Sequence, residues 1–174
     1  LNLNVWTPSI SDGQKRPVMV WLHGGGFSGG SSIESYAYDG ENLSRTGNVV
    51  VISVNHRLNV MGHLDLTAYG KQYTQSANAG VMDLVSALQW VKANAAAFGG
   101  DSNNVTIFGE SGGGAKVLTL MGTPAAKGLF HKAIVQSGAV EGMGMTLLAP
   151  QTTRRVAELT LMNLGIKPEE VEKL

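Results

Sequence analysis

The chain has 174 residues, of which 43% are hydrophobic and 15% charged, and its 13 basic and 13 acidic side chains cancel. This balance is typical of a globular protein and offers no excess charge to attract nucleic acid or an anionic membrane surface. The chain has no cysteine, which excludes disulfides and thiolate metal sites, and no apolar run approaches the ~20 residues that span a bilayer.

Apolar runs bounded by Gly, Asn or His predict four buried strands, at residues 18–22, 49–54, 105–108 and 133–135. They are rich in β-branched residues and do not alternate with polar ones, which indicates a parallel sheet covered on both faces.

Helical spacing of apolar residues predicts a helix over 78–98, with Asn78 as its N-cap, and further helices over 112–121 and 152–164. Pro168 predicts the start of a last short helix. The segments 33–45 and 60–77 are expected to be loops near the mouth of a site. Strands that alternate with helices predict an α/β fold with a doubly wound, mostly parallel sheet flanked by helices.

Ser111 follows the strand predicted at 105–108 and precedes the helix predicted at 112–121, within the motif Gly109-Glu-Ser-Gly-Gly113. A Gly-x-Ser-x-Gly motif between a strand and a helix is typical of a nucleophile elbow, a sharp turn that exposes the serine hydroxyl above the sheet. The flanking glycines permit the turn because they carry no side chain. The sequence therefore predicts Ser111 as a nucleophile, although a structural turn with an incidental serine has the same pattern.

A second glycine run, Gly24-Gly-Gly26, follows the strand at 18–22 and is itself followed by Phe27. A serine nucleophile needs donors for the oxyanion that forms when it attacks a carbonyl, and backbone N–H groups in a glycine run serve this purpose well. The N–H of Gly112, at the start of the next helix, is the expected second source of such donors. A tight loop with packing duties only is the alternative for Gly24-Gly-Gly26.

Together these motifs resemble those of the type-B carboxylesterases, a family that includes para-nitrobenzyl esterases and cholinesterases. The resemblance runs in order along nearly the whole chain. It rests on Leu3-Asn-Val-Trp-Thr-Pro8, His23-Gly-Gly-Gly-Phe27, Val54-Asn-His-Arg-Leu58, Asn78-Ala-Gly-Val-Met-Asp83, Ala97-Phe-Gly-Gly-Asp101, Gly109-Glu-Ser-Gly-Gly113 and Leu129-Phe-His-Lys-Ala-Ile-Val-Gln-Ser-Gly138.

The resemblance implies an α/β-hydrolase fold and hydrolysis of small-molecule carboxylic esters through an acyl-enzyme, without a metal or organic cofactor. By position it implies oxyanion donors at Gly25, Gly26 and Gly112. Gly24, Glu110 and Phe27 are expected around this site. Phe27 is expected either to line the substrate pocket or to pack in the core.

The catalytic triad of an α/β-hydrolase follows the chain order Ser, then Asp or Glu, then His. After Ser111 the only histidine is His131, and no acidic residue lies between the two. In the family that the chain resembles, the acid and the histidine come more than a hundred residues after the serine. We therefore expect residues 1–174 to be part of an α/β-hydrolase domain, with strands missing before and after, that is inactive without the remainder of the same enzyme.

Several other residues have competing interpretations. Glu110 is expected to face away from the Ser111 hydroxyl and, as a buried carboxylate, to need a partner, for which Arg57 is one candidate. His23 is expected to shape the oxyanion loop, and His56, His63 and His131 lack metal-ligand spacing. Trp21 and Trp90 are expected in the core. Met143 and Met145 are expected near the substrate, with the filling of gaps in the packing as the alternative. A non-catalytic, cholinesterase-like binding or adhesion protein is the alternative function, and the sequence assigns no cellular compartment.

Overall fold

The computed structural model describes residues 1–10, 12–138 and 148–174. Its centre is a five-stranded sheet with the order β1-β3-β2-β4-β5. All neighbouring strands are parallel except β1, which pairs antiparallel with β3. The strands are β1 (Asn2–Trp6), β2 (Arg16–Leu22), β3 (Val50–Asn55), β4 (Gly100–Glu110) and β5 (Lys132–Gln136). The predicted mostly parallel sheet is confirmed.

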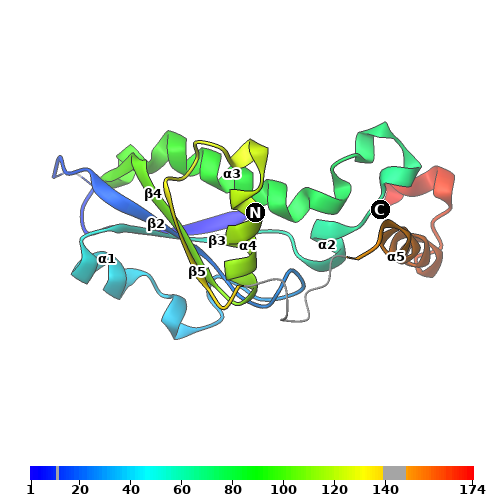
Figure 1. The fold of residues 1–174 in the computed structure, drawn as a ribbon, viewed down its shortest axis with the longest axis horizontal. Helices are drawn as coiled ribbons and strands as arrows, with labels where there is room; N and C mark the ends of the chain where they lie inside the picture. The colour runs from blue at the N-terminus through cyan, green and yellow to red at the C-terminus, as the bar shows by residue number, and fades with distance from the viewer. Residues whose placement is uncertain (11, 139–147) are drawn as a thin grey trace.

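The centre of the sheet is apolar because β2, β3 and β4 align their β-branched residues. Val20 of β2 pairs with Ile52 on one side and with Ile107 on the other, and each is at most 1% exposed. Such a strand core is stable only when helices cover both faces. Figure 1 shows α1 on one side of the sheet and α3 on the other.

Helices connect β2 to β3, β3 to β4 and β4 to β5, and one more helix follows β5. They are α1 (Glu41–Gly47), α2 (Asn59–His63), α3 (Ala79–Asn94), α4 (Gly112–Met121) and α5 (Pro150–Asn163). Short 3₁₀ helices lie between them: η1 (Tyr36–Tyr38), η2 (Thr67–Tyr69), η3 (Lys71–Tyr73), η4 (Ser76–Asn78), η5 (Ala95–Phe98), η6 (Pro124–Ala126) and η7 (Pro168–Lys173). The helices predicted at 78–98, 112–121 and 152–164 and after Pro168 are all present, with small shifts at their ends.

Two local predictions were wrong, and a third was right only in position. The segments 33–45 and 60–77 contain α1, α2 and four of the 3₁₀ helices and are not plain loops. These helices have seven residues or fewer, so they are too short to show the apolar period that identifies a longer helix. Asn78 occupies the N-cap position of α3, but its side chain makes no capping hydrogen bond.

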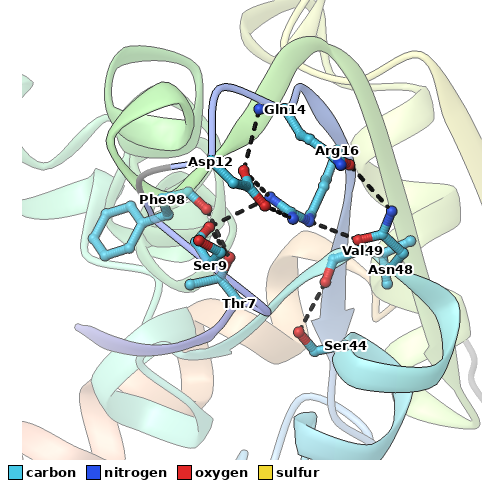
Figure 2. Close-up of polar contacts among 9 residues, drawn as sticks. All are labelled: Thr7, Ser9, Asp12, Gln14, Arg16, Ser44, Asn48, Val49 and Phe98. Atoms are coloured by element: carbon cyan, nitrogen blue, oxygen red, sulfur yellow. Dashed lines mark hydrogen bonds and ion pairs between the residues drawn. The ribbon is translucent and has the colours of Figure 1, made fainter.

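Buried Arg16 organises the end of the sheet where β2 begins. Its Nε donates to Asn48 Oδ1 at 2.7 Å, its Nη1 lies 3.4 Å from the carbonyl oxygen of Ser9, and its guanidinium pairs with the Asp12 carboxylate. Figure 2 shows this network. The hydrogen bond from Arg16, supported by the backbone N–H of Gln14, lowers the pKa of Asp12 to about 2. Arg16 thus ties the loop before β2 to the residue that ends α1.

The strand β5 is an edge of this sheet, because β4 is its only neighbour among the described residues. All five of its residues are exposed. The helix α5 lies away from the sheet (Figure 1). It contributes to a second, small apolar cluster of Leu64, Leu66, Ala157, Leu161 and Val171. The predicted substrate contacts Met143 and Met145 lie outside the described residues.

Candidate functional site

The two predicted motifs meet because β2 and β4 are parallel neighbours. Leu22, the last residue of β2, is in register with Gly109 of β4. The segments that follow the two strands therefore emerge side by side at the same edge of the sheet. The strand order reverses here, because β3 lies beyond β2 on one side and β4 on the other. In open α/β sheets such a switch point is where ligands bind.

Ser111 forms the whole turn between β4 and α4. Its φ of 53° and ψ of −120° are rarely adopted by a residue with a side chain. Its backbone N–H donates to the Gln136 carbonyl at 2.8 Å, which links the turn to the end of β5. The side chain is partly exposed. The structure thus has the strand, turn and helix that the sequence predicts around this serine.

Close packing around the turn requires glycine. A Cβ on Gly109 would lie 2.5 Å from the carbonyl carbon of Gly113, and a Cβ on Gly113 would overlap the carbonyl oxygen of Leu22. With no side chains between them, α4 begins directly against β2 and β4. The positive end of its helix dipole is then beside Ser111.

The segment Gly24-Gly-Gly26, referred to below as the glycine loop, lies against this turn. A Cβ built on Gly24 would be 3.7 Å from the Cβ of Ser111, and one built on Gly112 would be 2.2 Å from the backbone nitrogen of Gly26. Gly25 and Gly26 have φ values of +80° and +63°, which favour glycine. No described residue accepts a hydrogen bond from the backbone N–H of Gly25, Gly26 or Gly112. These donors are available to a ligand.

Two buried histidines support the glycine loop from beneath. His23 Nδ1 donates to the Gly24 carbonyl at 2.9 Å, and His56 Nδ1 donates to the Arg57 carbonyl at 3.0 Å. The two imidazole rings are stacked 5.3 Å apart. Burial, together with the nearby charge of Lys116, lowers the pKa of His23 and lowers that of His56 to about 4. Both rings are therefore neutral at neutral pH.

Sequence reasoning missed Lys116, which is fully buried in α4, five residues after Ser111. Its Nζ lies 2.9 Å from the His23 carbonyl oxygen and 3.5 Å from that of Gly24. Burial lowers the pKa of Lys116 to about 8, against the opposing attraction of Glu34. A single lysine in the apolar stretch after the elbow was the available sequence signal.

The expected partner of Glu110 was wrong. Arg57 instead forms a bidentate pair with Asp83 of α3, through Nε to Oδ2 at 2.9 Å and Nη2 to Oδ1 at 2.8 Å. Glu110 is exposed and makes no ion pair within the described part of the chain, so it needs no buried partner. The prediction failed because it assumed that Glu110 is buried.

Phe27 packs inside the molecule. Its half-buried ring contacts the main core, meets the His63 ring edge-on at 5.4 Å and lies 5.9 Å from Lys116 Nζ. Trp21 and Trp90, both expected in the core, are also half-buried. Trp90 packs on the main core, while Trp21 lies 5.0 Å from the rings of both Tyr38 and Phe108.

The remaining histidine, His131, is remote from Ser111. It exchanges backbone and side-chain hydrogen bonds with Val105, near the middle of β4. Ser111 lies six positions further along the chain than Val105, a distance of about 20 Å in an extended strand. Across 1–10, 12–138 and 148–174 no group of three His, Asp or Glu side chains could hold a metal ion. No described helix is long and apolar enough to cross a membrane.

The fold and the strand–turn–helix elbow at the switch point define an α/β-hydrolase. The model of the carboxylesterase family matches residues 1–173, and the chain belongs to that family.

Individual relatives and solved structures agree with this family assignment. The chain is 43% identical to the para-nitrobenzyl esterase of Bacillus subtilis (strain 168) over all 174 residues, and 43% identical to the acetylcholinesterase of Gallus gallus over 159 residues, 91% of this chain. These matches cover 34% and 20% of those proteins, so the chain spans only about a third and a fifth of their length.

Among solved structures, an esterase from anaerobic Clostridium hathewayi, described as able to hydrolyze aliphatic aromatic polyesters, superposes with a TM-score of 0.92 at 53% identity. The match covers 98% of this chain and 34% of that one. A carboxylesterase of Geobacillus stearothermophilus superposes with a TM-score of 0.89 at 46% identity, covering 98% and 35% of the two chains.

Proposed function

We propose that the chain supplies the nucleophile and the oxyanion hole of a serine carboxylesterase that acts on small-molecule esters. The observation that carries this proposal is the meeting of two motifs at one edge of the sheet. Ser111 forms a strained turn, and the N–H groups of Gly25, Gly26 and Gly112 beside it have no acceptor among the described residues. Membership of the carboxylesterase family supports the same chemistry.

In the proposed reaction the Ser111 hydroxyl attacks the ester carbonyl carbon while a histidine removes its proton. The C–O bond to serine forms, and the carbonyl π electrons move to the oxygen, which becomes the oxyanion bound by the three N–H groups. The intermediate then collapses, the bond to the alcohol breaks, and the histidine returns the proton to the leaving alcohol. Water hydrolyses the acyl-enzyme by the same steps.

The histidine and its acidic partner are proposed to come from chain beyond Leu174. His131 is remote from Ser111, and His23 and His56 lie buried beneath the glycine loop with Nδ1 bound to carbonyl oxygens. None of these is placed to take the serine proton. The partner of residues 1–174 is therefore the remainder of the same enzyme.

A comparison of residues 1–174 with a longer protein, in which these residues are joined to the remainder of the same enzyme, tests this proposal. It is called the longer protein below. Each is incubated with a fluorophosphonate probe and with a short-chain p-nitrophenyl ester, with Ser111→Ala as the control. We expect turnover and labelling by the longer protein alone, both lost in the Ser111→Ala variant. Robust turnover by residues 1–174 would contradict the missing-triad argument. An unlabelled, inactive longer protein would instead favour a binding or adhesion role.

A further inference from the structure

Lys116 is a charged residue in an apolar place. It is 0% exposed, and no carboxylate forms an ion pair with it in the described part of the chain. Glu34 attracts it only from a distance. A buried ammonium without a paired carboxylate is costly, and an apolar residue of similar volume often stabilises a fold more. The charge therefore needs an explanation beyond packing.

The hydrogen bonds of the Lys116 side chain and its contact with an aromatic ring are all with residues 23–27. Its Nζ donates to the carbonyl oxygens of His23 and Gly24, and its charge faces the ring of Phe27. The Gly24 oxygen also accepts a hydrogen bond from His23 Nδ1. Two donors, one on α4 and one at the end of β2, therefore hold a single carbonyl group.

The orientation of that carbonyl fixes a donor on the opposite side of the peptide. In a trans peptide the C=O of one residue and the N–H of the next point in opposite directions. The described chain has no cis peptide bond. When Lys116 and His23 hold the Gly24 C=O inward, the N–H of Gly25 must point outward. Backbone sterics alone would not fix this peptide group, because glycine tolerates both signs of φ. The Gly25 carbonyl is held separately, by the N–H groups of Ser28 and Gly29.

We propose that Lys116 is a positioning residue of the oxyanion hole, which holds the Gly24 carbonyl and thereby directs the Gly25 N–H toward the oxyanion. This inference rests on the proposed esterase function. The ammonium also polarises both peptide groups that it binds, which strengthens their N–H donors.

A change of pH offers one readout. Burial lowers the pKa of the Lys116 ammonium to about 8. The charged or titratable groups around it are Glu34, His23 and His56. Both histidines are neutral at neutral pH. Loss of the Lys116 proton should weaken its hold on the two carbonyl oxygens. The kcat of the enzyme is then expected to decline as the pH rises through about 8.

The test uses the longer protein with Lys116→Met, Lys116→Gln and a matched control, Lys92→Met. Lys92 also donates to a backbone carbonyl, that of Gly128 at 3.2 Å, but on the exposed side of α3. For each variant kcat, KM, melting temperature and the inhibition constant of a trifluoromethyl ketone are measured. This inhibitor forms a hemiketal oxyanion on the serine, so it reports on the donors directly.

Complete removal of an oxyanion donor costs about 10²–10³ in kcat, so misdirecting one is expected to cost about 10- to 100-fold. We expect Lys116→Met to show this loss with little change in KM, an inhibition constant raised by a similar factor, an unchanged or higher melting temperature and no decline of kcat near pH 8. Lys116→Gln keeps a neutral donor and should recover part of the activity. Lys92→Met should match the wild type.

Two results would overturn the inference. One is a Lys116→Met enzyme with wild-type kcat and inhibitor affinity. The other is a loss of kcat that follows a lower melting temperature while inhibitor affinity per folded enzyme is unchanged, which is the signature of a packing role. A wild-type protein without turnover or Ser111 labelling would remove the proposed function, and this inference with it.

Discussion

At the scale of single residues, the site depends on backbone groups more than on side chains. Apart from Ser111, the proposed machinery in this chain consists of N–H groups on glycines, and the nearby side chains act by holding carbonyl groups. Fixed main-chain donors suit this role because they need no reorganisation when charge develops. Substitutions that move the glycine loop should therefore impair kcat even when no functional group is removed.

Gly25 offers a direct test of this dependence in the longer protein. A Cβ on Gly25 would lie 2.5 Å from the carbonyl oxygen of Gly29, and its φ of +80° disfavours any other residue. We expect Gly25→Ala to lower kcat for a p-nitrophenyl ester by about 10²-fold or more, because an oxyanion donor is displaced. Gly29→Ala is the matched control, because a Cβ there meets nothing within 4 Å. Equal kcat values for the two variants would contradict the assignment.

His56 predicts a dependence of stability on pH. Its pKa is lowered from 6.5 to about 4 by burial and the charge of Lys116. Below pH 6.5 the unfolded chain binds a proton that the folded chain excludes, so stability should fall as the pH drops from about 6.5 to 4.

One pKa unit corresponds to about 1.4 kcal/mol, so the loss from His56 is expected to be about 1–3 kcal/mol. Urea unfolding of the longer protein at several pH values measures it. His56→Gln should flatten the pH dependence, and an unchanged slope in that variant would show that His56 does not titrate as described.

At the scale of elements, the pair Arg57–Asp83 joins the end of β3 to α3. Asp83 is largely buried, and burial alone would raise its pKa, but hydrogen bonds from the side chain and backbone of Arg57 outweigh this and lower it. Arg57 is half exposed, so the pair is partly screened by solvent. The pair fixes the position of the first turns of α3 relative to the end of β3.

We expect Asp83→Asn to destabilise the longer protein by about 1–3 kcal/mol, since it weakens charge-assisted hydrogen bonds at a largely buried carboxylate. Glu158→Gln, which breaks the exposed pair with Arg155, is the control and should cost no more than about 0.5 kcal/mol. Chemical denaturation measures both. Equal effects would show that the Arg57–Asp83 pair is only a surface contact.

Sequence patterns predicted the elements where one physical signal dominates. The strands β2 and β3 and the helix α4 were found because apolar runs and glycine punctuation are local. The first half of β4 was missed because it is polar, as at Asn103 and Asn104, and irregular: Gly100 pairs with Arg16 of β2, and regular pairing with β2 resumes only at Val105. The Arg57–Asp83 pair and buried Lys116 escaped for another reason: each depends on a partner distant in sequence, which no local pattern reveals.

At the scale of the whole molecule, the exposed edge strand β5 is the feature of residues 1–174 that most favours aggregation. Ile134 and Val135 of β5 are 44% and 38% exposed on an edge strand. Exposed apolar edges promote aggregation because their backbone groups can pair with other chains.

Residues 1–174 alone are therefore expected to be poorly soluble or molten. Near-ultraviolet circular dichroism on heating and the binding of a hydrophobic dye test this expectation. We expect strong dye binding and no cooperative transition. A sharp and reversible melting transition would show that these residues form a self-sufficient domain.

The central claim is that Ser111 and the N–H groups of Gly25, Gly26 and Gly112 converge on one oxyanion. A crystal structure of the longer protein after reaction with a fluorophosphonate tests it most directly. We predict a covalent bond from phosphorus to Ser111 Oγ, with the phosphonyl oxygen about 2.7–3.1 Å from the three nitrogens. An adduct on another residue, or a phosphonyl oxygen turned away from the glycine loop, would contradict the account.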